Sequence, residues 1–213
     1  CTNVPQNRVA CDHLEEQVPP LETLGRDFVV APLVDRPGQT AVVRVAAYFD
    51  NTVLRFDPPT LRPATTLAAR QVLQFQSSRA FRVSASRPVL VAQLMEGQGA
   101  GSRTVTGDPA MVYEVPAQQF RDRYDLLVPA TYTQNFLSVV VPRGARPLLD
   151  GSPIEGMRST VGPWEVLATP VAAGAHRVRT VEGVPLGVKV YGTAPFTSYM
   201  YPGGLDLQLL PPG

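Results

Sequence analysis

The sequence predicts an all-β protein built as two similar, antiparallel, β-sandwich-like lobes that pack together. Apolar and polar residues alternate with a period of two along much of the 213-residue chain, whereas long helical periodicity is missing. The 22 prolines interrupt almost every candidate helix. A similar succession of strand patterns occurs in both halves of the chain, which favours an internal duplication.

The first 24 residues are expected to form a small loop and a short helical turn around Leu14 to Gln17. Cys1 and Cys11 are the only cysteines, and we predict a disulfide between them; a lipid-modified Cys1 is the alternative. A disulfide indicates an exported protein. Asp12 could cap the helical turn. The segment has no recognised zinc spacing, so we expect no metal site.

The first lobe is expected at residues 25–97. Segment 41–49, AVVRVAAYF, is a nearly continuous apolar run that is rich in β-branched residues. Segment 79–86 places Phe81 and Val83 on one face and polar residues on the other. These patterns predict strands of a sheet that is covered on at least one side. A polar, glycine-rich connecting loop is expected at residues 98–106.

The second lobe is expected at residues 107–213. Segment 135–141, NFLSVVV, repeats the long apolar strand of the first half. Each half also ends in a strand that follows a proline, SRPVLVAQL in the first and GVPLGVKVYG in the second. Segment 205–210 alternates like one more strand, and we expect it to close the second lobe.

Charge and hydropathy limit the classes of partner. The formal net charge is +1, with acidic and basic residues interspersed, so nucleic acid is not an expected partner. No stretch approaches the roughly 18 to 20 apolar residues of a membrane span. Lys189 is the single lysine among 19 basic residues, a bias that indicates a GC-rich, bacterial genome. Because the first residue is Cys1, we expect a mature product or an excised domain.

The chain carries no recognisable catalytic motif. His13 and His176 are the only histidines, and the sequence contains no nucleophile elbow, zinc-protease helix, dinucleotide fingerprint or P-loop. We expect His176 to bind a backbone carbonyl in a tight turn. We therefore predict a protein that is not an enzyme and takes no cofactor, and a hydrolase that uses Glu16 with His176 is the alternative.

Four side chains are candidates for contact with a partner. Arg121 and Arg123 belong to the charge-alternating segment RDRYD, which suits ion pairs across a solvated face or contacts with an acidic partner. Phe196 and Tyr199 are the two rings expected in a loop near the end of the chain. Trp164 is more typical of a core or inter-lobe anchor.

Five motifs, taken together, resemble the IgGFc-binding domain family. In chain order they are CDHLEEQVPPLETLGRDFVVAPL, SRPVLVAQLMEG, GDPAMVYEVPAQQFRDRYDLLVP, AGAHRV and VYGTAPFTSYMYPGG. The resemblance runs from Asp12 to Gly204, and the members of this family include many secreted or surface proteins of bacteria. Each motif is weak by itself, whereas their order and spacing are specific.

The resemblance implies a secreted or cell-surface interaction module without enzymatic activity. Adhesion, or a structural role in a fibre or surface layer, is the expected function, with a protein, a glycan or another copy of the chain as partner. A glycan- or immunoglobulin-binding domain of a larger protein is the alternative. The resemblance transfers no individual binding residue to this chain.

Overall fold

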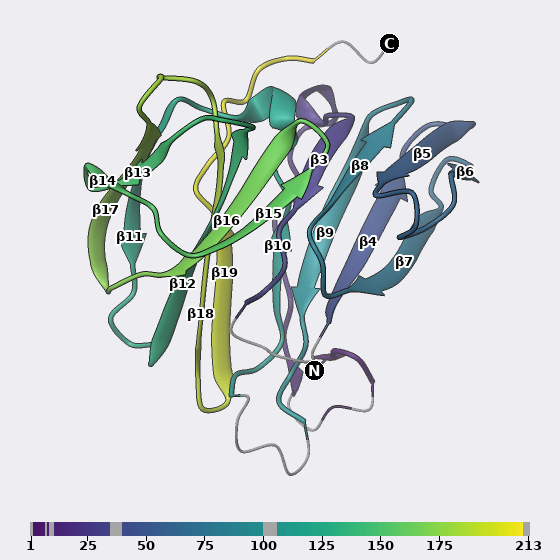
Figure 1. Cartoon of the computed structure of the whole chain (residues 1–213). Coiled ribbons are helices and arrows are strands. Elements are labelled where there is room, and N and C mark those ends of the chain that lie inside the picture. Colours follow the sequence, from purple (N-terminus) through teal and green to yellow (C-terminus); the bar gives the residue numbers. More distant parts are fainter. Residues whose placement is uncertain (1, 7, 9–10, 35–39, 100–105, 211–213) are drawn as a thin grey trace.

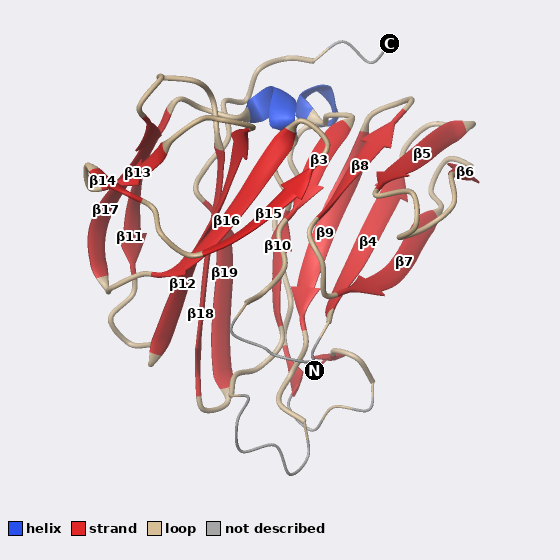
Figure 2. Cartoon of the chain, in the orientation of Figure 1, coloured by secondary structure: helices blue, strands red, loops and turns tan. Residues whose placement is uncertain are grey.

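The protein consists almost entirely of β-structure. The computed structural model describes residues 2–6, 8, 11–34, 40–99 and 106–210. Within these residues the helical elements are two 3₁₀ turns, η1 (Leu21–Thr23) and η2 (Ala117–Gln119), and every other regular element is a strand (Figure 2). The predicted all-β class is confirmed. No helix in the described part of the chain is long and apolar enough to cross a membrane.

The first group of strands forms two four-stranded antiparallel sheets, which we call the amino-terminal sheet pair (Figure 1). One sheet has the strand order β3 (Asp27–Val30), β8 (Phe81–Ala85), β5 (Thr52–Asp57) and β6 (Thr65–Leu67). The other has the order β10 (Ala110–Tyr113), β9 (Val89–Met95), β4 (Ala41–Ala47) and β7 (Val72–Ser77). Apolar side chains from both sheets, including Phe28, Val45, Leu54 and Phe81, form one buried core.

The remaining large sheets form the carboxy-terminal sheet pair. The four-stranded sheet has the order β11 (Arg123–Val128), β17 (Gly174–Thr180), β13 (Pro147–Leu149) and β14 (Ser152–Pro153). The five-stranded sheet has the order β15 (Met157–Val161), β16 (Trp164–Pro170), β12 (Gln134–Pro142), β18 (Gly187–Ala194) and β19 (Thr197–Pro202). Their shared core includes Leu126, Val139, Val178 and Leu186.

The order of strands is the same in both sheet pairs. The order β3-β8-β5-β6 corresponds to β11-β17-β13-β14, and the order β10-β9-β4-β7 corresponds to β19-β18-β12-β16. Strand β15 is an addition at the free edge of β16. This correspondence supports the predicted internal duplication, because two unrelated sandwiches have no reason to share an order in both sheets.

Two details at the end and middle of the chain differ from expectation. Segment 205–210 contains no strand, so the expected closing strand there is wrong; β19 closes the sheet instead, paired with β18 in a tight hairpin. Strand β10 falls in the range expected for the second lobe, yet it pairs with β9 of the amino-terminal sheet pair. The alternation of apolar and polar residues predicts a strand but does not predict which other strand it pairs with.

The amino-terminal segment is extended. Strands β1 (Thr2–Asn3) and β2 (Cys11–Asp12) pair with each other. The helical turn expected around residues 14–17 is wrong, because these residues lead into two prolines that favour extended backbone, and the turn η1 starts only after them. The predicted disulfide requires Cys1, which lies outside the described residues, and it stays a prediction.

The two sheet pairs pack against each other through apolar contacts. Edge strands β10 and β19 lie side by side, and Val112 meets Tyr191 and Met200 in one buried cluster (Figure 1). A second cluster contains residues of both pairs, and in it Trp164 contacts Phe120 edge-on, with ring centroids 5.6 Å apart. Trp164 therefore packs at the junction, as expected for an anchor.

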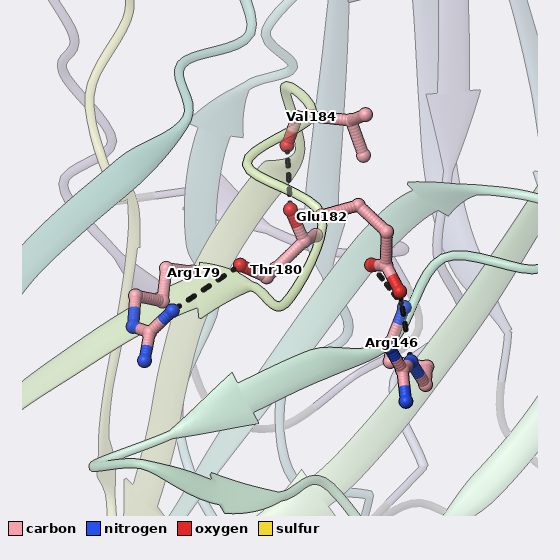
Figure 3. Close-up of polar contacts among 5 residues, drawn as sticks. All are labelled: Arg146, Arg179, Thr180, Glu182 and Val184. Atoms are coloured by element: carbon pink, nitrogen blue, oxygen red, sulfur yellow. Dashed lines mark hydrogen bonds and ion pairs between the residues drawn. The ribbon is translucent and has the colours of Figure 1, made fainter.

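Polar contacts hold the exposed turn between β17 and β18 in place (Figure 3). The carboxylate of Glu182 accepts hydrogen bonds from the backbone N–H of Arg146, at 2.9 Å, and from its side-chain Nε, at 2.8 Å. Thr180 Oγ1 donates to the carbonyl of Val184 at 3.0 Å. These bonds fix the path of the chain as it enters β18.

Candidate functional site at the junction of the sheet pairs

Strand β18 carries a lysine into the junction. All eight residues of the strand are buried, because both faces are covered. Val188 and Val190 point into the core of the carboxy-terminal sheet pair. Side chains alternate along a strand, so Lys189 and Tyr191 lie on the opposite face, toward the amino-terminal sheet pair.

The partners of Lys189 come from β9 and from the residue that follows β10. On β9, Val89 and Val91 point into the core of the amino-terminal sheet pair. Gln93 lies on the same face of the strand, two residues nearer to the junction. Glu114 directly follows β10. The sequence thus places one amide and one carboxylate opposite the lysine.

These three side chains form a buried hydrogen-bond network. Lys189 Nζ donates to Gln93 Oε1 and, at 2.6 Å, to Glu114 Oε1. Gln93 Nε2 donates to the carbonyl of Ala31 at 2.9 Å. The Lys189 and Glu114 side chains are only 6% and 8% exposed. Removal of either partner would leave an uncompensated charge in the protein interior, which strongly destabilises the fold. Each of the two charges is therefore stabilised by the other.

A small cavity adjoins the network. Its volume is about 20 Å³, and its lining includes Lys189, Glu114, Ala31 and Ser138. Ser138 Oγ is buried and has no hydrogen-bond partner among the described residues. The lining is mainly apolar, with Lys189, Glu114 and Ser138 as polar members, and a cavity of this size accommodates about one water-sized molecule.

A larger groove opens next to this cavity. Its volume is about 120 Å³, and it shares Tyr113, Glu114, Val115 and Pro202 with the smaller cavity. Apolar side chains from the amino-terminal segment, β3, β9 and the end of the chain dominate the lining, among them Leu24, Phe28, Leu90, Pro116 and Leu205. The groove therefore combines an apolar floor with polar groups at its rim.

Glu16 and Tyr113 are the titratable groups at the rim of the groove, together with the paired Glu114. Burial alone raises the pKa of the Glu16 carboxyl, and no cation among the described residues opposes that shift. Burial, followed by the nearby Tyr48 and Glu16, raises the pKa of the Tyr113 hydroxyl. An apolar groove with an unneutralised carboxylate favours a ligand that is apolar and carries a positive charge.

The comparison with known families covers the amino-terminal sheet pair and most of the carboxy-terminal sheet pair. Residues 1–192 match the family described as IgGFc binding protein, which is the family that the sequence motifs resemble. The chain belongs to this family. No curated protein and no solved structure matches it.

Two of the four predicted contact residues, Arg121 and Phe196, lie at opposite ends of β18 in this family member. Arg121 forms an isolated bridge with Leu186, just before the strand, whereas Phe196 lies just after it. Eight strand residues span roughly 26 Å at about 3.3 Å per residue. The structure therefore does not bring the arginines and the aromatic rings into one site.

Their environments also differ. Phe196 is 66% exposed at the tip of the β18–β19 hairpin. Tyr199 lies in β19, not in a loop, and its ring packs partly buried against the carboxy-terminal core while its hydroxyl donates to Asn135 Oδ1 at 2.7 Å. Arg123 is exposed, with Nε 3.6 Å from Asp125 Oδ2. Phe196 is the strongest remaining surface candidate of the four.

The hydrolase alternative finds no support in the geometry. His176 Nδ1 binds Asp150 Oδ2 at 2.7 Å and Nε2 binds the carbonyl of Ala172 at 2.9 Å, so both ring nitrogens are engaged, as expected for a structural histidine. Burial lowers the pKa of His176, but these acceptors outweigh it and the net shift is upward. Glu16 lines the groove, to which His176 does not contribute. Among the described residues, no group of three or more His, Cys, Asp or Glu could hold a metal.

Sequence reasoning missed the junction network. The available signal was Lys189 itself, a single lysine within the otherwise apolar end strand GVPLGVKVYG. A lysine in such a strand needs a buried acceptor or an anion. The sequence did not identify Gln93 and Glu114 as those partners, because they lie 96 and 75 positions away.

Proposed function

We propose that this chain is an extracellular protein-binding module with an adhesive or structural role. Membership of the IgGFc-binding family supports a protein partner and a secreted or surface location. The single observation that carries the proposal at the level of a site is the groove at the junction of the sheet pairs, with its apolar floor and the unneutralised Glu16.

The proposed occupant is an extended, proline-containing segment of a partner protein that carries one basic side chain. Prolines and large apolar residues line the groove, and such surfaces suit extended segments whose backbone is already ordered before binding. A basic side chain of the partner would meet Glu16 at the rim. Charge pairing at a rim mainly sets specificity and association rate, while the apolar contacts supply most of the affinity.

A matched pair of charge reversals tests this proposal. Glu16→Arg is expected to weaken the binding of short proline-rich peptides that carry one arginine about tenfold, equivalent to about 1.4 kcal/mol. Glu15→Arg is the control, because its side chain is 82% exposed and does not line the groove. The measurement is fluorescence anisotropy with peptides that carry arginine, glutamate or neither. Equal binding of all three peptides, or equal effects of the two variants, would contradict the proposed site.

Immunoglobulin Fc is a second candidate partner, favoured by the description of the family. The binding of the unmodified chain and of Glu16→Arg to immobilised Fc fragment distinguishes two cases. Binding that Glu16→Arg weakens assigns Fc to the groove, and binding that is unchanged assigns it to another surface. Sizing and negative-stain microscopy under non-reducing conditions test self-assembly, for which filaments are the supporting outcome.

A further inference from the structure

Lys189 lies in an environment suited to covalent chemistry. It is the only lysine of the chain, it is buried, and its Nζ is hydrogen-bonded to the amide oxygen of Gln93 and to the carboxylate of Glu114. A buried amine in contact with both a carboxamide and a carboxylate has the components of an acyl-transfer site. The proposed binding function uses neither the lysine nor the amide.

We propose that Lys189 and Gln93 form an isopeptide bond that joins β18 to β9, with Glu114 as the catalytic acid and base. The new bond connects Lys189 Nζ to Gln93 Cδ. The bond from Cδ to Nε2 breaks, and ammonia leaves. No oxidant, reductant or cofactor is required.

The protons and electrons balance through Glu114. The Glu114 carboxylate accepts one proton from the Lys189 ammonium, which frees the lone pair of Nζ. This lone pair adds to Cδ, and the carbonyl electron pair moves to Oε1. Glu114 then delivers a proton to Nε2, the carbonyl re-forms, and the last extra proton of Nζ leaves with ammonia as ammonium. Glu114 ends as the carboxylate that it was at the start.

Gln93 is a better electrophile than Glu114 in this network. An ionised carboxylate resists attack because it already carries negative charge, whereas the amide carbon is neutral and its oxygen accepts a hydrogen bond from the lysine. Gln93 Nε2 donates to the carbonyl of Ala31, which fixes the amide plane. Holding the reacting groups in contact replaces a bimolecular encounter and lowers the barrier to attack.

The adjacent cavity offers a place for the leaving ammonia. It has a volume of about 20 Å³, and Lys189, Glu114 and Ser138 line it. Ser138 Oγ is buried without a hydrogen-bond partner among the described residues, so it is available to bind a small polar molecule. Ala31, whose carbonyl accepts the hydrogen bond from Gln93 Nε2, belongs to the same lining.

Intact-mass spectrometry of the folded, reduced chain is the direct test. We expect a mass lower than that of the sequence by one molecule of ammonia, and fragment spectra that connect the peptide containing Gln93 to the peptide containing Lys189. A chain held in denaturant from synthesis onward should show the full mass and lose ammonia only on refolding. Full mass after folding overturns the proposal, and loss of water in place of ammonia overturns it in favour of a bond to Glu114.

Three variants sharpen the result. Glu114→Gln and Lys189→Arg are expected to keep the full mass, since one lacks the proton carrier and the other lacks the amine. Gln93→Glu is also expected to keep the full mass, since an ionised carboxylate at this position resists attack. Glu165→Gln is the matched control, because Glu165 pairs with Arg158 and belongs neither to the network nor to the lining of the cavity, and it should lose ammonia like the unmodified chain. An ammonia loss that persists in Lys189→Arg would contradict the assigned bond.

Discussion

Two ion pairs that involve the carboxy-terminal sheet pair share their chemistry and differ in their surroundings. Lys189 and Glu114 are 6% and 8% exposed at the junction, whereas Arg146 and Glu182, beside the outer turn, are 71% and 34% exposed. The Nζ–Oε1 distance of the first pair is 2.6 Å and the Nε–Oε1 distance of the second is 2.8 Å. Distance alone therefore does not distinguish them.

Burial decides what each pair does. At the junction both charges have given up water, and each is stabilised only by the protein groups around it, so the pair couples the two sheet pairs. At the outer turn, water and salt screen the pair, and its effect is confined to the local path of the chain (Figure 3). Buried polar groups at the junction therefore specify how the two sheet pairs pack together, whereas similar exposed groups on the outer sheet only stabilise a turn.

Removal of the junction lysine should have the largest effect. In a Gln93→Met background, in which Lys189 cannot form a bond to residue 93 and keeps its charge, Lys189→Met leaves Glu114 buried without its cation, which is expected to lower the free energy of unfolding by about 3 to 5 kcal/mol. Urea denaturation followed by tryptophan fluorescence measures the change, because Trp164 packs at the junction. Arg146→Met is the control at the outer turn.

In the same Gln93→Met background, the combination of Lys189→Met with Glu114→Leu tests the reason for this loss. It should recover much of the stability, because it removes the stranded charge together with its former partner. A loss in Lys189→Met no greater than in Arg146→Met would show that burial does not separate the two pairs.

Two glycines near the start of β18 extend the comparison to packing. A Cβ on Gly187 would lie 2.4 Å from the Phe120 ring, so Gly187→Ala forces a shift at the junction and should cost about 1 to 3 kcal/mol. Gly183, in the outer turn, has nothing within 4 Å of such a Cβ, and its φ of +69° is the only obstacle. Gly183→Ala should therefore cost about 1 kcal/mol. Thermal unfolding of both variants shows which substitution costs more stability. A larger drop in melting temperature for Gly183→Ala than for Gly187→Ala would contradict the expected tighter packing at the junction.

Much of the fold could be predicted from the sequence, because strand patterns are local. The long runs at 41–49 and 135–141 correspond to β4 and β12, and the strands that follow a proline correspond to β9 and β18. The side chains of these strands alternate or are uniformly apolar, and that signal needs no knowledge of the partner strand.

The pairing of edge strands and the junction network could not be predicted in this way. Strand β10 could join either neighbouring sheet, and only the packed structure shows that it pairs with β9. Glu114 follows β10, so its meeting with Lys189 depends on the same choice. Tyr199 was expected in a loop because its segment is rich in turn residues, but pairing with Gly192 of β18 makes it part of a strand. In each case a contact between distant residues overrides a local preference.

The smallest expected effect is a pH dependence at the outer turn. The backbone N–H of Arg146, followed by its side chain, holds the pKa of Glu182 at about 2, below its ordinary value of 4.5. Because the folded-state pKa is lowered, the contribution of Glu182 to stability is fully present above pH 4.5 and is lost as the pH falls toward about 2. Glu182→Gln should therefore lower the melting temperature slightly near neutral pH and leave it unchanged at the acidic end of this window. Asp122→Asn is a control, since this carboxylate has no such contacts with Arg146, and it should not reproduce the difference. A gap between Glu182→Gln and the unmodified chain that widens with acidification would have the wrong sign for a carboxylate stabilised by the fold.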